Sequence, residues 1–438
     1  AKEIDETRPF TRADFIFREN NSAEAAVNNV IVSQGGIIGL NYARNNDVLQ
    51  RAESYGAIFI SESASALNSR GVYSNIENGG SNKNHDGAFH LTSYDVSFPA
   101  WGTSANYALW ETLSIDCIAG SFVWTGFDYI GEPTPWNDWK RGSQTGKGAV
   151  PNTAYFGIID PDGFPKDTYY LYRSQYNNNS YTLHIVNAWD KNNICFSDEK
   201  RTKTPVHIYS NVAKYDVYRS DKEKPICSST RKKIITSVGY VYYIYEGKSY
   251  DESICQVIAP SDPGTSLFTR YNILFDEKTS LYAKAFDENG ELIDGKNISG
   301  NQYIATPNIN KLKLKINLDK NVIIANGRSL AYVEVSIVDD KGVLNSIGDD
   351  LIYFNIEDEI GKILGVDNGD QATEEKFQQK KVLFREDSAV IRLYRGKALA
   401  IIASDKEGVI KLEVSSEKYG AESLEIKVVL EENSLSEI

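Results

Sequence analysis

The chain has 438 residues, of which 41% are hydrophobic, so it is long enough for two or three domains with cores of their own. The net charge of −13 argues against nucleic acid and anionic membranes as partners. No apolar run approaches the roughly 20 residues of a membrane span, and the first residues are charged rather than signal-peptide-like. The four cysteines are widely spaced and the four histidines do not cluster, so we expect no metal site and no cofactor.

Residues 1–178 alternate short apolar runs with polar, helix-like segments. The apolar runs at 10–13, 37–42, 57–61 and 118–128 predict strands, whereas 47–55 and 104–113 predict helices. Alternation at this spacing indicates a parallel sheet. Four such units make half of a (β/α)8 barrel, and an open four-stranded sheet is the other interpretation.

From about residue 181 the hydrophobic period changes to two, which is typical of β-sandwiches. A linker-like stretch near 305 divides this part into 179–304 and 305–438, and the polar segment 222–263 resembles an insertion. The FDENGEL sequence predicts a hairpin in which Asn289 and Gly290 form a type I′ turn. The strands are expected at 204–218, 280–286, 312–318, 332–338, 409–414 and 424–430.

Glu62 ends a buried strand and is followed by small residues, which is where a barrel places catalytic groups. The alternative is a structural glutamate that caps the next helix or pairs with an arginine. Tyr42 and Trp124 end neighbouring strands in the same way. A carboxylate, a phenol and an indole around one opening suit a sugar, because the aromatic ring stacks on the sugar and the polar groups bind its hydroxyls. The alternative for both aromatic residues is packing in the core.

Several longer strings resemble glycoside hydrolase family 2, in its multi-domain bacterial β-galactosidase branch. They are FISESASALNSRGVYS, IIGLNYARN, AGSFVWTGFDYIGEPTPW, YFGIIDPDGFPK and, near the C-terminus, LGVDNGD. The resemblance implies that Glu62 is the catalytic nucleophile, that Tyr42 hydrogen-bonds to it, and that Trp124 lines the sugar subsite. Weaker matches to substrate-binding positions are Asn41, Asp128 and Glu132, and Trp136 is expected at the entrance.

The fold implied by this resemblance is the C-terminal half of a TIM barrel followed by two immunoglobulin-like sandwiches. The implied function is a retaining exo-β-glycosidase of the β-galactosidase type, which works through a glycosyl-enzyme intermediate. That mechanism needs a second carboxylate, about 5–5.5 Å from the first, as acid/base. In the family this residue is the Glu of an Asn-Glu pair at the end of the fourth barrel strand, and no such pair precedes a strand–helix series here. We therefore expect an upstream half-barrel to supply it, and negligible hydrolysis by this chain alone.

Two other functions remain open. A β-glucuronidase of the same family would need a cationic contact, for which Lys140, Arg141 and Lys147 are candidates. The other alternative is a non-catalytic fragment that binds glycans or partners. The expected partner is a carbohydrate substrate, with a second copy or the missing N-terminal half as possible protein partners. The resemblance implies a bacterial protein, periplasmic or extracellular if the full-length protein carries a signal peptide. The segment 160–163 resembles the start of a calcium loop but lacks the downstream glutamate, so a turn is expected.

Overall fold

The computed structural model describes residues 5, 7–14, 22–43, 55–76, 88–136, 151–357, 359–377 and 388–431. The chain divides into two compact units. Unit 1 contains Ala1–Ile159, Pro165–Asn187 and Ile194–Ile304, and unit 2 contains Asp160–Phe164, Ala188–Asn193 and Ala305–Ile438. Across these described ranges, no helix is both long and apolar enough to cross a membrane.

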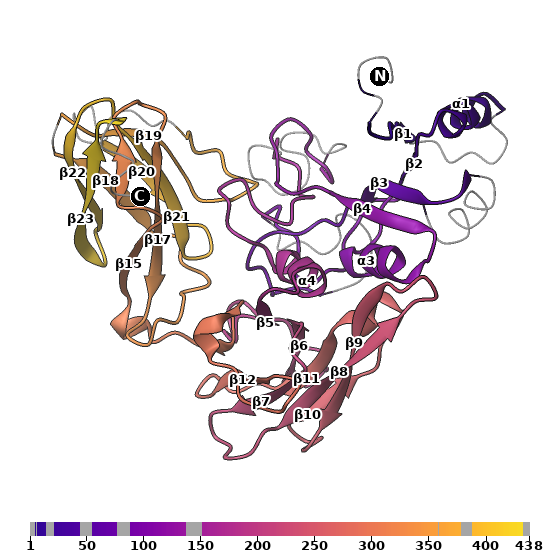
Figure 1. The fold of residues 1–438 in the computed structure, drawn as a ribbon. Helices are drawn as coiled ribbons and strands as arrows, with labels where there is room; N and C mark the ends of the chain where they lie inside the picture. Colours follow the sequence, from indigo (N-terminus) through magenta and orange to yellow (C-terminus); the bar gives the residue numbers. More distant parts are fainter. Residues whose placement is uncertain are drawn as a thin grey trace. The chain divides into compact units, whose positions relative to one another are not determined.

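Unit 1 begins with a parallel sheet whose four strands follow one another in chain order (Figure 1). The core on this sheet is aliphatic and includes Ile38, Leu40, Ile58 and Ile60, all nearly inaccessible to solvent. Burial of β-branched and leucine side chains explains why these short runs form strands. The strands are β1 (Ala13–Asp14), β2 (Ile38–Asn41), β3 (Ile58–Ala64) and β4 (Ile118–Trp124).

The helices that accompany this sheet are α1 (Ser22–Ser33), α3 (Ala105–Ser114) and α4 (Asp167–Tyr176). The buried carboxylate of Asp95 caps α3, because it accepts the backbone N–H groups of Ala105 at 2.8 Å and Asn106 at 2.7 Å. The prediction of a helix at 104–113 is confirmed. Most of the helix predicted at 47–55 lies outside the described residues.

The rest of unit 1 is a sandwich of two five-stranded sheets, in the orders β10-β11-β6-β5-β13 and β14-β12-β7-β8-β9. The first sheet contains β5 (Tyr181–Val186), β6 (Lys203–Ser210), β10 (Cys255–Ile258), β11 (Thr269–Leu274) and β13 (Ile298–Ser299). The second contains β7 (Lys214–Arg219), β8 (Cys227–Ile235), β9 (Val241–Ser249), β12 (Ser280–Phe286) and β14 (Tyr303–Ala305). Short 3-10 helices occur at Gly264–Leu267 and Gly295–Asn297.

A buried network joins this sandwich to α4. Asp167, in the first turn of α4, accepts the hydroxyl of Tyr73 at 3.0 Å and lies 2.7 Å from Nε2 of His184 on β5. Nδ1 of His184 accepts the backbone N–H of Asn301 at 3.0 Å. Because Nδ1 is an acceptor, the proton of a neutral His184 sits on Nε2 and is donated to Asp167.

Three expectations for this sandwich need correction. The segment 222–263 is not an insertion, because β8, β9 and β10 are part of the two sheets. The single strand predicted at 204–218 is two strands, β6 and β7, which belong to different sheets. The FDENGEL hairpin exists, with Phe286 bridging Leu292, but only Gly290 has a positive φ, of 80°. A type I′ turn needs two such residues, so the turn is of another type.

Unit 2 is built around a second sandwich with sheets β15-β17-β21-β19 and β16-β23-β22-β18-β20. Its core is a continuous aliphatic cluster that includes Val333, Val335, Ile352, Phe354 and Ile410. The four-stranded sheet contains β15 (Lys313–Leu318), β17 (Leu330–Val338), β19 (Lys362–Asp367) and β21 (Lys397–Ala403). The other contains β16 (Val322–Ile324), β18 (Leu351–Ile356), β20 (Ser388–Arg392), β22 (Gly408–Ser416) and β23 (Gly420–Val429). A 3-10 turn at Ile309–Lys311 precedes it, and the expectation of a mainly β region after residue 181 is confirmed.

Candidate active site

The carboxyl ends of β2, β3 and β4 lie side by side. Asn41 is paired with Glu62 across β2 and β3, after a register shift between Leu40 and Asn41. Ala64 is paired with Trp124 across β3 and β4. Because the strands are parallel, the three ends open on the same edge of the sheet. The sequence prediction that Tyr42, Glu62 and Trp124 end adjacent strands therefore agrees with the strand register.

Tyr42 and Glu62 are joined by a backbone hydrogen bond, in which the N–H of Tyr42 donates to the carbonyl of Glu62 at 2.7 Å. Their side chains are also close enough to interact, since Glu62 adds to the effect of burial in raising the pKa of Tyr42. The hydroxyl of Tyr42 also accepts the hydroxyl of Ser65 at 2.8 Å, so its own proton is free to go to the carboxylate. Burial, reinforced by Glu62, raises the pKa of Tyr42 well above its ordinary value, so the phenol remains a proton donor at every physiological pH.

The backbone around Glu62 is held in an unusual conformation. Tyr42, Ala64 and Ser65 have φ values of 54°, 67° and 53°, in the left-handed region that non-glycine residues seldom occupy. Each such residue costs on the order of 1–3 kcal/mol, and residues of this kind cluster at functional sites. Tyr42 donates its backbone N–H to Glu62, and Ala64 and Ser65 follow Glu62 by two and three residues in the chain. All three thus lie next to Glu62, which supports a functional reason for the conformation.

Trp124 and Glu132 are linked through Tyr129. The rings of Trp124 and Tyr129 are perpendicular, with centroids 6.0 Å apart. Tyr129 in turn donates to the carboxylate of Glu132, which also accepts the hydroxyl of Thr134 at 3.3 Å. Burial and the charge of Glu132 raise the pKa of Tyr129, and Glu62 adds to this effect. Trp124 therefore has a fixed orientation.

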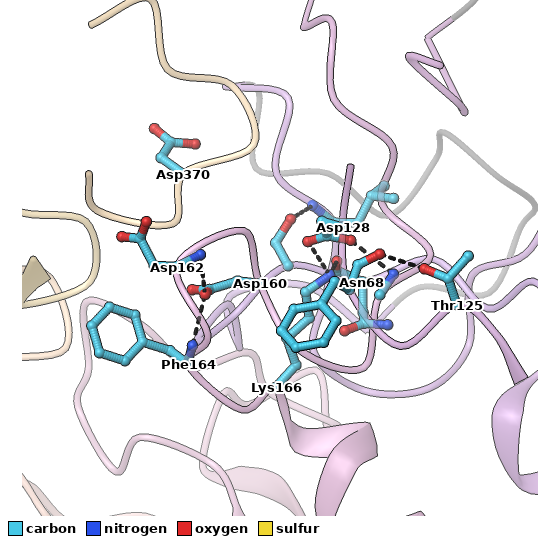
Figure 2. A network of polar contacts seen from close by, with 12 residues as sticks. Asn68, Thr125, Asp128, Asp160, Asp162, Phe164, Lys166 and Asp370 are labelled. Carbon is cyan, nitrogen blue, oxygen red and sulfur yellow. Dashed lines mark hydrogen bonds and ion pairs between the residues drawn. The ribbon is translucent and has the colours of Figure 1, made fainter. Parts of the chain in front are cut away.

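Asp128 is buried and its carboxylate is already engaged (Figure 2). One oxygen accepts the backbone N–H of Gly157 at 2.8 Å, and the other lies 2.6 Å from Nζ of Lys166. The lysine also donates to the carbonyl of Asn68 at 2.8 Å. Gly157 is required here, because a Cβ at this position would lie 2.2 Å from the backbone nitrogen of Asp128. Both oxygens thus hold the loops together, and the expectation that Asp128 binds substrate stays a prediction.

Trp136 is completely buried, with its ring centroid 5.2 Å from that of Phe89 and 5.9 Å from that of Tyr155. The ring packs against protein, and its expected place at the entrance stays a prediction. Asn41 is also buried, and its side-chain oxygen accepts the hydroxyl of Ser61 at 2.5 Å. Residues 77–87 and 137–150, which follow the strands of this region, lie outside the described residues.

The calcium-loop resemblance at 160–163 corresponds to a turn within unit 2. One oxygen of Asp160 accepts the backbone N–H groups of Asp162 at 3.1 Å and Phe164 at 2.9 Å (Figure 2). In the described part of the chain, no group of three or more His, Cys, Asp or Glu residues is arranged to hold a metal ion.

Three residues of this region were not predicted from the sequence: Ser65, Tyr129 and Lys166. Tyr129 and Lys166 lie inside strings that resemble the family, but their chemistry depends on contacts that spacing alone does not reveal. A lysine three residues after an Asp-Gly turn is expected at the surface until its partner is known. Ser65 also lies inside a string that resembles the family, but nothing in the string marks it as the partner of Tyr42.

Comparison with known proteins identifies the family. Residues 314–425 match the glycoside hydrolase family 2 C-terminal domain 5. The chain is 27% identical over 442 residues to the β-galactosidase BoGH2A of Bacteroides ovatus, an alignment that covers 98% of this chain and 42% of that protein. It is 24% identical over 257 residues to a putative β-glucuronidase of Formosa agariphila, covering 57% of this chain and 19% of that protein.

The fold is also found among solved structures. A β-glycosidase from Bacteroides vulgatus superposes with a TM-score of 0.67 at 17% identity, covering 98% of this chain and 52% of that one. The chain thus spans about half the length, or less, of the relatives that it matches. The domain match, the relatives and the shared fold agree, and the chain is a member of glycoside hydrolase family 2.

Proposed function

We propose that the protein containing this chain is a retaining exo-β-glycosidase of the β-galactosidase type, with Glu62 as its nucleophile. The observation that carries the proposal is the meeting of Tyr42 and Glu62 at adjacent strand ends, where the backbone N–H of Tyr42 donates to the carbonyl of Glu62 and the Tyr42 hydroxyl is held by Ser65. The names of the relatives support a β-glycosidase, and the 27% identity to BoGH2A favours galactose as the sugar.

In this mechanism the carboxylate of Glu62 attacks the anomeric carbon while the glycosidic oxygen leaves with a proton from an acid/base. Water, deprotonated by the same acid/base, then hydrolyses the glycosyl ester and regenerates the carboxylate. Tyr42 orients Glu62 through its hydroxyl proton, and Ser65 orients Tyr42. Trp124 offers a ring face to the sugar, because its edge-to-face contact with Tyr129 holds the indole in place.

Asn41 and Glu132 complete the proposed sugar-binding set. Asn41 lies opposite Glu62 in the strand register, and Glu132 is held by Tyr129 next to Trp124. Asp128 acts in this scheme as a positioning residue, because its ion pair with Lys166 fixes the loop that carries Tyr129.

We assign residues 1–178 to the C-terminal half of a (β/α)8 barrel, followed by immunoglobulin-like sandwiches at 179–304 and 305–438. The parallel sheet in sequential order supports the half-barrel, because doubly wound sheets reverse their strand order. The acid/base then belongs to the preceding half, so the 438 residues alone should show negligible turnover. Loss of a positioned acid/base typically reduces the rate by about 10²–10⁴-fold.

A β-glucuronidase is the second candidate, favoured by the name of the Formosa agariphila relative. Its expected cationic contacts, Lys140, Arg141 and Lys147, lie outside the described residues. A non-catalytic fragment that binds glycans remains the alternative from another class.

The test combines kinetics with trapping of the intermediate. Nitrophenyl β-galactoside and β-glucuronide are assayed with the 438-residue chain, with a longer protein that includes the preceding half-barrel, and with its Glu62→Gln variant. A 2-deoxy-2-fluoroglycoside should label Glu62, which peptide mass mapping detects. Glu334→Gln is the matched control, because Glu334 is also a half-buried, hydrogen-bonded strand residue but belongs to unit 2. Full activity of Glu62→Gln, or a label elsewhere, would refute the assignment, and preference for the glucuronide would favour the second candidate.

A further inference from the structure

A cleft of about 700 Å³ lies at one end of the first sandwich, within unit 1. It is lined by residues just before and at the start of β5, in the turn after β6, on strands β8 and β9, and in the hairpin after β12. Its volume is in the usual range of small-molecule sites, about 300–1,000 Å³. Glu62 and its partners do not line it, so this cleft is separate from the candidate active site.

The cleft is rich in asparagine side chains that face solvent. Asn178, Asn179, Asn289 and Asn297 line it and are all exposed. Within the described residues, none of these four side-chain amides makes a hydrogen bond. Each amide offers both donors and an acceptor, which is the combination that a sugar hydroxyl needs.

An aromatic ring accompanies these amides. Tyr181, the first residue of β5, lines the cleft with 39% of its surface exposed. A second ring, that of Tyr243, is covered on one side by the guanidinium of Arg231, whose carbon lies 4.1 Å from the ring centroid. Exposed tyrosine next to free amides is a surface on which the apolar face of a sugar can stack.

The charges in the cleft decide between neutral and anionic ligands. Arg231 is the one cation among the lining residues, and it already donates to the carboxylate of Glu288 and the carbonyl of Asn211. Asp287, also in the lining, accepts two backbone N–H groups of its own turn. With the arginine neutralised and a carboxylate remaining, the cleft repels an anion.

We infer that this cleft is an accessory binding site for a neutral oligosaccharide, held by the exposed amides and by stacking on Tyr181. Binding at this site does not depend on the proposed role of Glu62. In a protein that hydrolyses chain ends, the site would hold the glycan chain close to the active site. Such a site requires no conformational change, because its four exposed asparagine amides are already free to bind.

Affinity gel electrophoresis of the full chain tests this inference. Gels contain one neutral polysaccharide each, based on galactose, glucose, mannose or xylose, and a further gel contains polygalacturonate. The protein carries Glu62→Gln throughout, so that hydrolysis cannot remove the ligand. We expect at least one neutral polysaccharide to retard the protein, and Tyr181→Ala or Asn297→Ala to weaken that binding about tenfold.

Two control variants match the test residues in type and exposure. Tyr303→Ala replaces a tyrosine that is 40% exposed, and Asn317→Ala replaces an exposed asparagine of β15; neither residue lines the cleft. Both controls should be retarded like the parent. The inference is overturned if no neutral polysaccharide retards the protein, if only polygalacturonate does, or if the cleft variants bind as well as the controls. Since binding and turnover are measured separately, failure of this inference leaves the proposed function untouched.

Discussion

Lys166 and Asp128 form an ion pair from which solvent is completely excluded, with Nζ 2.6 Å from Oδ2. The pair connects the loop after β4 to the segment that leads into α4, and the lysine extends the connection to Asn68 after β3. Removing one partner would leave the other as an uncompensated buried charge, which is far more costly than the pair is stabilising.

Lys166→Met should therefore lower the free energy of unfolding by about 3–5 kcal/mol, measured by urea denaturation. The double variant Asp128→Asn/Lys166→Met should recover part of this loss, because no charge remains unpaired. Lys362→Met is the control, since the ion pair of Lys362 with Asp405 is half exposed and should contribute far less to stability. Equal stability of Lys166→Met and the parent would contradict the structural role of the pair.

Tyr42→Phe removes the phenolic proton from Glu62 but keeps the ring. A hydrogen bond to a charged group contributes about 1.5–3 kcal/mol, so kcat of the active protein should fall roughly 10–100-fold with little change in stability. Tyr245→Phe is the comparison, because it removes a buried hydroxyl that donates to Val212 at 2.9 Å in the first sandwich. That variant should lose stability and keep kcat, and the reverse pattern would exclude a positioning role for Tyr42.

His207 should make the protein sensitive to mild acid. Burial lowers the pKa of this histidine from 6.5 to about 3, and Arg270 adds to the effect. Below pH 6.5 the unfolded chain gains a proton that the folded chain does not, so stability is lost as the pH falls, by up to about 1.4 kcal/mol per pH unit. His207→Phe, which keeps an aromatic ring between Tyr94 and Phe268, should flatten the dependence between pH 6.5 and 4. An unchanged slope in thermal unfolding would refute this.

Asp367 should act in the opposite direction, in unit 2. Burial raises the pKa of its carboxyl from 3.8 to about 6, and the charge of Asp160 contributes. The folded chain then keeps a proton that the unfolded chain releases, so this contribution is complete below about pH 4 and is lost as the pH rises through 6. Asp367→Asn, which still offers an oxygen to the N–H of Asn368, should raise the melting temperature at pH 7 and not at pH 4. A destabilised variant at pH 7 would show that the charged form is the favoured one.

The sequence predicted elements well where burial determines them. The strands near Glu62 and the helix at 104–113 could be predicted because the apolar residues of each recur at a single regular spacing. Tertiary contacts only extend these elements. The segment 222–263 does not look like sheet in the sequence because several side chains of β8, such as Lys232 and Lys233, are exposed. Its strands are held by backbone pairing with β9, which leaves no hydrophobic pattern in the sequence.

Within the candidate site, residue type was informative and residue partners were not. Glu62 and Tyr42 could be singled out because each ends a buried strand. Asp128 and Trp136 have the same types as sugar-binding residues, yet both are enclosed by protein. Which aromatic ring or carboxylate faces a ligand depends on loop paths, and these depend on features such as the positive φ of Ser65 that composition does not encode.

The contact of His184 and Tyr73 with Asp167 has a consequence for the inheritance of these domains. A recombination point between α4 and β5 would give one gene a carboxylate without its imidazole and the other an imidazole without its carboxylate. The first sandwich and the sheet that carries Glu62 are therefore expected to be inherited and exchanged between genes as one unit. Grafting experiments should cut beyond Asn301, the residue whose N–H fixes the tautomer of His184.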